Sequence, residues 1–249
     1  MSKTDSLTRS AAAYDDAERV AIYDAKMNIM HPNRAKMAEM VCAMLPFAAN
    51  DKITLLDLGT GTGFLTAYLL EAFPRASIIA VDGAAAMMQQ AQARLHEKAQ
   101  ALSWEICTFQ ELARKAATLP QLDAVVSCFA LHHLSAEQKL ELYRALNGQM
   151  RRGAWFINAD IVTLPHTKIE ARYQYLRCLG IQQRIQEQLG EDRALEAIAA
   201  ELAELERTDG DQPLRLEQDL QLLREAGLQE VDCFWKETRE AVWGGCRLE

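Results

Sequence analysis

A glycine-rich turn between a strand-like segment and a helix-like segment places the tightest constraint on the fold of this chain. Residues 53–64, ITLLDLGTGTGF, pass from an apolar stretch straight into three alternating glycines. Glycine lets the backbone turn sharply and lets a ligand lie against bare amide groups. The helix that follows has an electropositive N-terminus, which favours a carboxylate or a phosphate. The turn therefore predicts a ligand-binding loop in an α/β domain.

Strand and helix signals alternate along the middle of the chain. The expected strands lie at residues 53–58, 78–81, 103–108, 124–127 and 154–159, and the expected helices at 64–73, 84–99, 111–117 and 136–150. A helix at 216–226 and strands at 230–235 and 240–243 follow near the end. This alternation is typical of βαβ units, and it predicts an α/β fold with a doubly wound sheet.

Two helical segments fall outside this alternation. Residues 11–30 and 34–45 show helical periodicity and are separated by His31-Pro32, because the residue before a proline disfavours the helical region. Residues 166–207 are helical throughout and contain no strand signal. The expected organisation is an N-terminal helical cap at 1–49, a cofactor-binding core made of 50–165 and 213–247, and a helical insertion at 166–212.

The composition argues against several classes of partner. The chain of 249 residues has 27 Lys or Arg and 35 Asp or Glu, so its net charge is −8 and it repels a phosphate backbone. Its six cysteines contain no CxxC pair, which gives neither a zinc ribbon nor a redox motif. The start lacks the apolar segment of a secretory signal, and no apolar run approaches the ~18 residues of a membrane span. We expect a cytoplasmic protein that binds neither nucleic acid nor membrane.

The spacing of the glycines separates the competing cofactor classes. The dinucleotide fingerprint GxGxxG, counted from Gly59, requires a glycine where this chain has Phe64, so the spacing is GxGxG instead. A phosphate-binding P-loop is also excluded, since no GK[ST] follows. Asp57, two residues before the first glycine, would sit badly beside a pyrophosphate but suits a ligand with a positive amine. A hydride-transferring dehydrogenase is therefore disfavoured.

Four segments occur in a fixed order around this loop. They are DLGTGTG at 57–63, the acid Asp82 after the strand IIAV, LDAVVSCFALHHL at 122–134, and RRGAWFINAD at 151–160. Together they resemble the class I S-adenosylmethionine-dependent methyltransferases, over about residues 50–160. The resemblance implies a Rossmann-like, seven-stranded, mostly parallel sheet whose last strand is antiparallel. It also implies S-adenosyl-L-methionine as cofactor, S-adenosyl-L-homocysteine as product, and in-line transfer of a methyl group to a small-molecule acceptor (EC 2.1.1 class).

The resemblance assigns roles to individual residues of these segments. Asp82 is expected to accept hydrogen bonds from the ribose hydroxyls, although an acid there also suits a helix N-cap. Asp57 is expected near the amino group of the methionine portion. Met87 packs on the adenine face or simply belongs to the core. The full expected cofactor-binding set is Asp57, Gly59, Thr60, Gly61, Gly63, Asp82, Gly83, Met87, Thr108, Phe109, Cys128 and Phe129.

Thr108 departs from the family pattern, which usually has an acid at this position to accept from the adenine amine. A threonine can still form a hydrogen bond there, and the backbone amide of Phe109 offers a second contact. Cys128 and Phe129 follow the fourth strand, so they are expected to flank the reactive methyl group.

Adjacent histidines, His132 and His133, supply the candidate catalytic groups. Adjacent residues on a helix point about 100° apart, so we expect at most one to face the site. That one would act as a general base, since imidazole titrates near neutral pH. The alternative is a packed or capping histidine. A metal site requires further ligands, and none is visible nearby in the sequence, so none is predicted.

The insertion is expected to form a lid over the ligand crevice, because it follows the fifth strand at the carboxyl edge of the sheet. Its first half, 168–184, holds four basic residues and only one acid, Glu170, and lies nearest that strand. An anionic or aromatic acceptor would suit it. The expected acceptor and lid residues are Arg172, Tyr173, Tyr175 and Arg177, joined by Tyr14 and Tyr23 from the N-terminal helices, where an aromatic ring suits a sulfonium.

Other functions remain open at this point. A carboxy-S-adenosylmethionine synthase has a similar helical insert and needs a basic residue for its extra carboxylate, for which Arg172, Arg177 and Arg184 are candidates. A cofactor-binding module without catalysis is a further alternative. The helical insertion could also pack against a second copy of the chain, which would give a homodimer.

Overall fold

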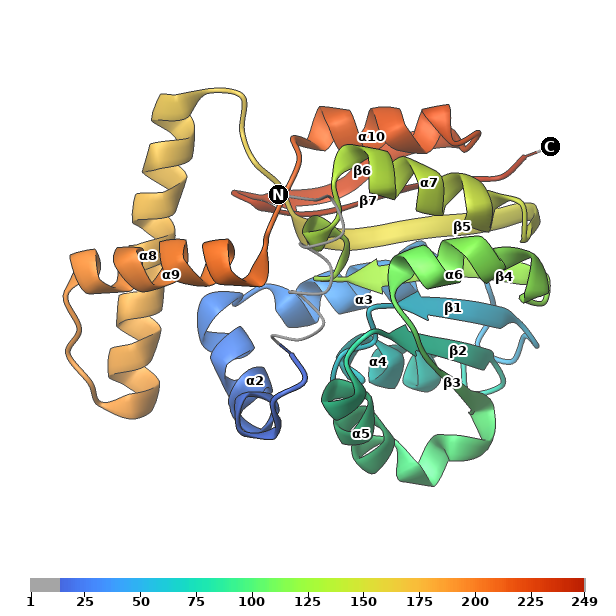
Figure 1. Ribbon diagram of the computed structural model, residues 1–249, viewed down its shortest axis with the longest axis horizontal. Helices are drawn as coiled ribbons and strands as arrows, with labels where there is room; N and C mark the ends of the chain where they lie inside the picture. The colour runs from blue at the N-terminus through green and yellow to red at the C-terminus, as the bar shows by residue number, and fades with distance from the viewer. Residues whose placement is uncertain (1–13, 249) are drawn as a thin grey trace.

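The computed structural model describes residues 14–248. The beginning of the expected N-terminal cap, residues 1–13, and therefore the start of the helix expected at 11–30, lie outside the described residues. The described part is built on one seven-stranded sheet with the strand order β3-β2-β1-β4-β5-β7-β6 (Figure 1). This confirms the predicted α/β, doubly wound fold.

The strand directions follow the prediction as well. The strands are β1 (Thr54–Leu58), β2 (Ser77–Asp82), β3 (Leu102–Ile106), β4 (Leu122–Cys128), β5 (Met150–Ile161), β6 (Gln229–Glu237) and β7 (Glu240–Cys246). Strands β1 to β5 pair in parallel. The last strand, β7, inserts antiparallel between β5 and β6. The carboxyl ends of the parallel strands therefore meet at one edge of the sheet.

Helices cover both faces of this sheet (Figure 1). On one face, α3 (Arg34–Met44) and α4 (Phe64–Ala72) pack into one buried cluster. On the other face, α6 (Phe109–Lys115), α7 (Ala136–Asn147) and α10 (Leu216–Glu225) pack into a second. Helix α5 (Ala85–Arg94) lies beside β2 and β3, and short 3-10 turns occupy His96–Ala101, Ala116–Thr118 and Leu131–His133.

Strand β1 illustrates why the sequence reads as a continuous apolar run. Leu55 belongs to the buried cluster on one face and Leu56 to the cluster on the other. Successive side chains of a strand point to opposite faces, so a strand covered on both sides needs apolar residues at every position. The glycine loop follows β1 directly, and the two clusters hold it at the carboxyl edge of the sheet.

The remaining helices stand beyond that edge. Helix α2 (Ala17–Met30) precedes α3, and the insertion folds into α8 (Thr167–Leu189) and α9 (Leu195–Asp209). Gly190 ends α8 in the left-handed conformation, with φ of 71°, so the chain turns back there. Ile181 of α8 and Ile198 of α9 share a small cluster with Ile29 of α2. The helical pair is thus anchored to the N-terminal region and projects at the left of Figure 1.

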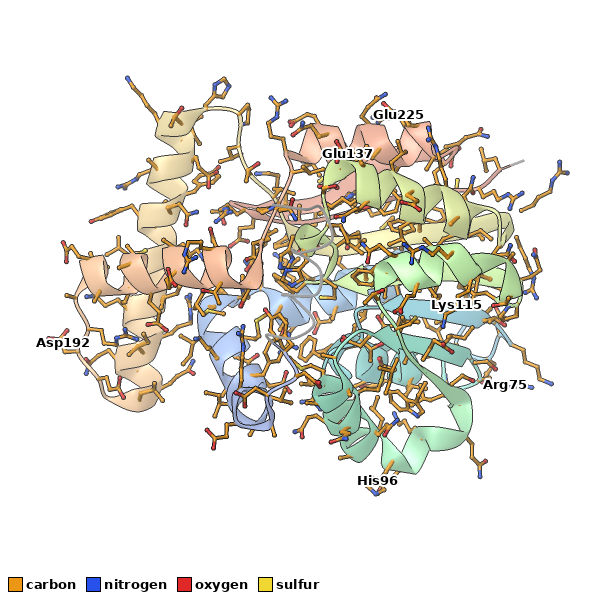
Figure 2. All side chains as sticks on the ribbon, in the orientation of Figure 1. Arg75, His96, Lys115, Glu137, Asp192 and Glu225 are labelled. Carbon is orange, nitrogen blue, oxygen red and sulfur yellow. The ribbon has the colours of Figure 1, made fainter. Side chains whose placement is uncertain are left out.

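Charged side chains are distributed around the outside of this framework, as Arg75, Asp192 and Glu225 illustrate in Figure 2. Among the helices of residues 14–248, none combines the length and the hydrophobicity that crossing a bilayer requires.

Candidate cofactor and acceptor site

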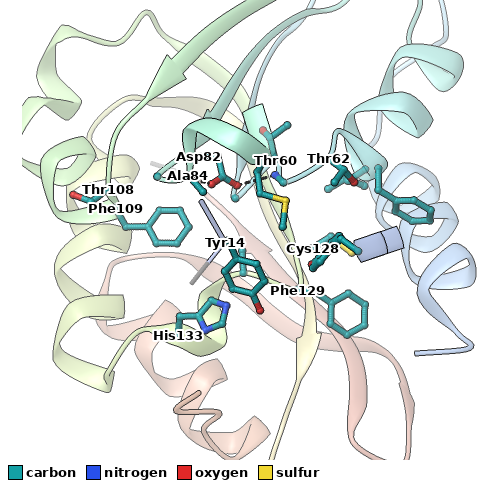
Figure 3. Close-up of a pocket in the computed structure, with 18 of the residues that line it drawn as sticks. Tyr14, Thr60, Thr62, Asp82, Ala84, Thr108, Phe109, Cys128, Phe129 and His133 are labelled. Carbon is teal, nitrogen blue, oxygen red and sulfur yellow. Dashed lines mark hydrogen bonds between the residues drawn. The ribbon is translucent and has the colours of Figure 1, made fainter. Parts of the chain in front are cut away.

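A pocket opens where β1, β2 and β4 end, and we call it the glycine-loop pocket. It is lined by ten residues of the expected cofactor-binding set: Gly59, Thr60, Gly61, Asp82, Gly83, Met87, Thr108, Phe109, Cys128 and Phe129. Tyr14, Tyr23 and His133 line it as well. Figure 3 shows Tyr14, Phe129 and His133 facing Asp82 across this pocket. Segments far apart in the sequence thus converge on one site.

The glycines of the loop adopt backbone conformations that other residues rarely reach. Gly59 has φ of 69°, and a Cβ built on it would lie 2.2 Å from the Cβ of Ala130. The amides of Gly59 and Thr60 both donate to the carbonyl of Val81, at 2.8 and 2.9 Å. Close approach to the loop after β4 therefore demands glycine at position 59. This packing leaves the edge of the loop open to a ligand.

Gly63 does not line the pocket, although it belongs to the expected set. It is the N-cap of α4, with φ of 78°, and a Cβ there would come 2.9 Å from Leu95 Cδ1. The structure accounts for this glycine by the packing of α4 against the segment after α5.

Asp82 lines the pocket and also caps the neighbouring backbone. Its Oδ2 accepts from the amide of Gly61 and its Oδ1 from that of Ala84, each at 2.8 Å. Burial raises the pKa of Asp82, despite these hydrogen bonds. Each carboxylate oxygen has a second lone pair, so the capping role leaves Asp82 able to accept hydrogen bonds from a ligand.

Asp57 lies beneath the loop and does not line the pocket. Its Oδ2 accepts from the hydroxyl of Thr66 at 2.5 Å, while its buried Oδ1 has no hydrogen-bond partner among the described residues. Burial raises the pKa of Asp57 to about 7. A buried carboxylate oxygen without a partner is costly, so this group is suited to a bound cation or to a proton.

Thr108 has a structural role that the sequence did not reveal. It is the N-cap of α6, where its hydroxyl and its amide both donate to Glu111 Oε2, at 2.9 and 2.8 Å. The capping box accounts for Thr108 without any ligand. Phe109 follows it on the pocket wall, next to Gly59.

Phe129 marks the end of β4 with a strained backbone. Its φ of 53° lies in the left-handed region, which a bulky residue rarely adopts. Its amide donates to the carbonyl of Ala159 at 2.9 Å, so the neighbouring strand holds the conformation. Strain of this kind is found most often beside functional sites.

Of the two histidines, only His133 lines the glycine-loop pocket, and His132 lies beside it. They lie in a 3-10 turn, Leu131–His133, with their ring centroids 4.1 Å apart. His133 lines the glycine-loop pocket, and His132 lines a second cavity beside it. The rings lie close together because each is held by a carboxylate from another segment, Asp160 or Asp211.

Asp160, the residue before the end of β5, holds His132 firmly. Its Oδ1 lies 2.6 Å from His132 Nδ1, and its Oδ2 accepts from the His132 amide at 3.0 Å. Burial acts to lower the pKa of His132, but the Asp160 carboxylate outweighs it and the pKa is raised. Burial lowers the pKa of His133, and the adjacent His132 lowers it further.

Asp211 approaches the same two rings from the turn after α9. Its Oδ1 lies 3.0 Å from His133 Nδ1 and 3.6 Å from His132 Nε2. The absence of a third ligand nearby in the sequence was the reason for predicting no metal site, and the fold supplies such a group from a distant segment. No local signal in the sequence TDGDQP could have revealed this contact.

The second cavity, which we call the α2–α9 cavity, has a volume of about 230 Å³. Its apolar wall consists of Ile22, Met27, Met30, Ile161, Leu202 and Leu205. It shares Tyr14, Tyr23 and Phe129 with the glycine-loop pocket, so the two spaces adjoin. Tyr14 is held at this junction, because its hydroxyl donates to Asp209 Oδ2 at 3.0 Å.

The charged groups of the α2–α9 cavity are largely paired with one another. Arg19 lies 2.6 Å from Asp209, and Arg177 lies 2.7 Å from Glu206. The expected attraction of an anionic acceptor by unpaired arginines is therefore not supported. The cavity instead offers mainly apolar and aromatic surface.

The lid residues are placed differently from the expectation. Arg177 lines the α2–α9 cavity, but Arg172 and Tyr175 are exposed and stack on each other, and Tyr173 lines a separate cavity beside α8. A helix of 23 residues is about 34 Å long, so α8 runs past the crevice. Helix α9, from the acidic half of the insertion, returns to it and supplies Leu202, Leu205, Glu206 and Asp209.

Arg34 is a pocket residue outside the expected site set. It lines the glycine-loop pocket, where its guanidinium lies 3.8 Å from the centre of the Phe64 ring. It also donates to Asp24 at 2.7 Å, and Thr62 of the loop donates to the same carboxylate. Helices α2 and α3 are thereby tied to the glycine loop.

Comparison with known proteins identifies a methyltransferase domain within the chain. Residues 55–153 match the model of the family described as a methyltransferase domain. A malonyl-[acyl-carrier protein] O-methyltransferase of Anoxybacillus flavithermus is 30% identical over 138 residues, which are 54% of this chain and 48% of that protein. The chain therefore spans about half the length of this curated relative.

Two solved structures extend the likeness to nearly the whole fold. An O-methyltransferase family protein from Burkholderia thailandensis has a TM-score of 0.62 at 18% identity, over 92% of this chain and 59% of that one. Human N-acetylserotonin methyltransferase, solved in complex with S-adenosylmethionine, has a TM-score of 0.62 at 14% identity, over 99% and 60%. Residues 55–153 thus match the methyltransferase-domain family, and the described chain has the Rossmann-like fold of these methyltransferase structures.

Proposed function

We propose that this protein transfers a methyl group from S-adenosylmethionine to a small-molecule acceptor held in the α2–α9 cavity. One observation carries the proposal: Tyr14, Tyr23 and Phe129 form a wall common to that cavity and the glycine-loop pocket. In-line displacement requires the acceptor on the far side of the methyl carbon from the sulfur. Two adjoining spaces with a shared wall suit this arrangement.

The residues of the glycine-loop pocket fit the cofactor of the family. Asp82 has lone pairs free for the ribose hydroxyls, and Asp57, buried beneath the loop, places a carboxylate near the pocket that favours a positive amino group through space. Gly59 and Gly61 leave room for the ligand to lie against the loop. Phe109, which lies next to Gly59 on the pocket wall, suits the adenine ring. When bound, S-adenosylmethionine supplies an activated methyl group and a sulfide leaving group.

The protein's own contribution is to position the acceptor and exclude water. The aromatic rings of Tyr14 and Tyr23 meet edge to face, with centroids 5.8 Å apart, at the junction of the two spaces. Positioning of this kind supplies about 7–11 kcal/mol in well-oriented reactions. His132 and His133 border the same junction, so they are the side chains that we place next to the reacting atom of the acceptor.

The walls of the α2–α9 cavity favour an acceptor with a largely apolar or aromatic body. Met27, Met30 and Leu202 provide adaptable apolar contacts, whereas the arginines are already paired. The names of the relatives range from a malonyl group on a carrier protein to N-acetylserotonin, so they do not select one substrate. They do include O-methyltransferases, and we propose a hydroxyl oxygen as the methyl acceptor.

The carboxy-S-adenosylmethionine synthase alternative loses its support in the structure. It required Arg172, Arg177 or Arg184 beside the cofactor, and none of the three lines the glycine-loop pocket. Arg34 does line it, but is paired with Asp24.

The experiment that tests the proposal has two parts. Calorimetry should show binding of S-adenosylmethionine and no binding of NAD. Incubation with S-adenosylmethionine and a panel of hydroxylated aromatic and aliphatic compounds should release S-adenosylhomocysteine only with a suitable acceptor. Binding of NAD alone would overturn the cofactor assignment. Cofactor binding without turnover across the panel would favour the non-catalytic module.

A further inference from the structure

We propose that His132, His133 and Asp211 form a binding site for a divalent transition-metal ion at the junction of the two cavities. This inference rests on the proposed function and deepens it, since the ion would contact the acceptor oxygen. His133 lines the glycine-loop pocket, whereas His132 and Asp211 line the α2–α9 cavity. An ion held by all three would therefore lie beside the junction of the two spaces, within reach of an acceptor oxygen that faces the methyl group.

The distances between the three ligand atoms suit a single ion. Asp211 Oδ1 lies 3.0 Å from His133 Nδ1 and 3.6 Å from His132 Nε2, and all three atoms lie within 4.8 Å of one another. Nitrogen and oxygen ligands bind such ions at about 2.0–2.2 Å. Two ligands of one ion are then about 3–3.6 Å apart, as simple geometry requires. An ion fits with small movements of the side chains.

The contact between His133 and Asp211 is short, but the two groups are poorly aligned for a hydrogen bond. Both His133 Nδ1 and Asp211 Oδ1 are buried without a hydrogen-bond partner among the described residues. Their side chains are only 11% and 12% exposed. The two atoms lie 3.0 Å apart and are poorly aligned for a hydrogen bond. A common ion would satisfy both, because each could donate a lone pair to it.

The surroundings of His132 are those of a metal ligand. Asp160 Oδ1 lies 2.6 Å from His132 Nδ1, so that nitrogen carries the proton and the lone pair belongs to Nε2, which faces Asp211. A carboxylate behind a histidine in this way orients the ring and strengthens its bond to a metal. Asp160 thus acts as a positioning residue.

The segment that carries Asp211 is fastened to the histidine turn. The amide of Gln212 donates to the carbonyl of His132 at 2.7 Å, and its side-chain amide donates to the carbonyl of His133 at 3.2 Å. The three ligands are therefore held together by the backbone, even though they come from distant parts of the chain.

Two imidazoles and one carboxylate favour ions such as Zn²⁺, Mn²⁺, Fe²⁺ or Co²⁺ over Mg²⁺ and Ca²⁺, which prefer all-oxygen sites. Three ligands leave coordination positions open for the acceptor hydroxyl, whose acidity the ion would increase. The hydroxyl oxygen then forms a bond to the methyl carbon as the carbon–sulfur bond breaks. The sulfonium leaves as a neutral sulfide, and the hydroxyl proton passes to solvent.

The experiment uses full-length protein without an affinity tag, treated with a chelator and then titrated with MnCl₂ or ZnCl₂ by calorimetry. We expect one ion per chain, a change in the electron paramagnetic resonance spectrum of Mn²⁺, and a rise in melting temperature. Asp211→Asn and His133→Gln should each weaken binding by about tenfold or more. The control is Asp192→Asn, on an outward-pointing side chain of the α8–α9 loop, which should leave the affinity unchanged (Figure 2).

Titration of the same samples with S-adenosylmethionine separates the two proposals. Intact cofactor binding without metal binding, or an Asp211→Asn variant that binds the ion as tightly as the wild type, would overturn the metal site alone. Failure to bind S-adenosylmethionine would overturn the proposed function. Cofactor binding also shows that each variant is folded, so a loss of metal affinity in a variant that binds cofactor is attributable to the missing ligand.

Discussion

The two halves of the site are built in opposite ways. The glycine-loop pocket is formed largely by strand ends and backbone, with Gly59, Gly61 and Asp82 close to one another through adjacent β1 and β2. The α2–α9 cavity is formed by side chains from segments far apart in the sequence, such as Met27, His132 and Leu202. A site made of backbone tolerates few substitutions, whereas a site made of side chains can be altered one contact at a time.

The largest effect should follow a substitution in the loop of the glycine-loop pocket. Gly59→Ala places a Cβ 2.2 Å from the Cβ of Ala130 at a φ of 69°. We expect a loss of about 3 kcal/mol in the free energy of unfolding, because overpacking adds to the backbone strain. S-adenosylmethionine binding should be lost as well. Denaturant unfolding and calorimetry measure the two effects.

The matched control for that variant is Gly153→Ala. Gly153 also has a positive φ, of 80°, but a Cβ there meets nothing within 4 Å. Only the backbone strain of about 1 kcal/mol is expected, with cofactor affinity unchanged. Equal losses in both variants would show that close packing of the loop is not what distinguishes this half of the site.

The next largest effect should follow a substitution of Asp82, whose side chain lines the glycine-loop pocket. Asp82→Ala should weaken binding of S-adenosylmethionine by about 1–3 kcal/mol, since it leaves polar groups of the ligand without a partner. The control is Asp16→Ala, which removes the N-cap of α2 without touching the pocket. An unchanged cofactor affinity in a folded Asp82→Ala protein would mean that Asp82 only caps the backbone.

The pH dependence of cofactor binding should be governed by Asp57. Its pKa is raised to about 7 by burial, and a bound ammonium group would favour the charged carboxylate. Affinity for S-adenosylmethionine should therefore rise several-fold between about pH 6 and pH 8. Asp57→Asn should bind more weakly and show a flatter profile. An unchanged profile in the variant would place the amino group elsewhere.

The ligand-free protein should show the opposite trend in stability. A carboxyl group whose pKa is raised in the folded state holds its proton there more tightly than in the unfolded chain. The Asp57 contribution to folding is therefore greatest below the unfolded pKa of about 4. It is lost as the pH rises through about 7. Thermal melts across this range, with Asp57→Asn alongside, measure the trend.

The smallest effect on cofactor affinity should follow a substitution in the α2–α9 cavity. Leu202 is 7% exposed and lines the α2–α9 cavity, so Leu202→Ala should cost about 2–3 kcal/mol of stability and raise KM for the acceptor. Its S-adenosylmethionine affinity should stay within about twofold, because Leu202 does not line the glycine-loop pocket. The control is Leu189→Ala, at a 57% exposed position of the same helical pair, which should change neither quantity. A large loss of cofactor affinity in Leu202→Ala would show that the two halves are coupled.

The same contrast between the two halves of the site explains how much of each could be predicted from the sequence. The glycine loop, the acid at the end of β2 and the aromatic residue Phe109 could be identified because they follow strands at predictable positions. The role of Asp160 was missed, although an acid at the end of a buried strand is itself a signal. Asp211 gave no signal, because only the return of α9 toward the histidine turn brings it there.

The orientation of the helical insertion could not be predicted from local sequence patterns. Its helices and their opposite charges could be predicted from periodicity and composition. Which half would face the crevice could not, because that depends on the length of α8 and on the turn at Gly190. The basic half was expected to approach the acceptor, but it contributes only Arg177 to the α2–α9 cavity, and the acidic half contributes more of the lining.

The sequence by itself determined the sheet, the glycine loop and the class of cofactor, because these depend on patterns between near neighbours: apolar runs, glycine spacing and acids at strand ends. The tertiary structure alone decided the α2–α9 cavity, the pairing of its arginines and the meeting of His132, His133 and Asp211. Contacts of this second kind join residues that no local pattern relates. They exist because helix packing brings separate segments to the carboxyl edge of one sheet.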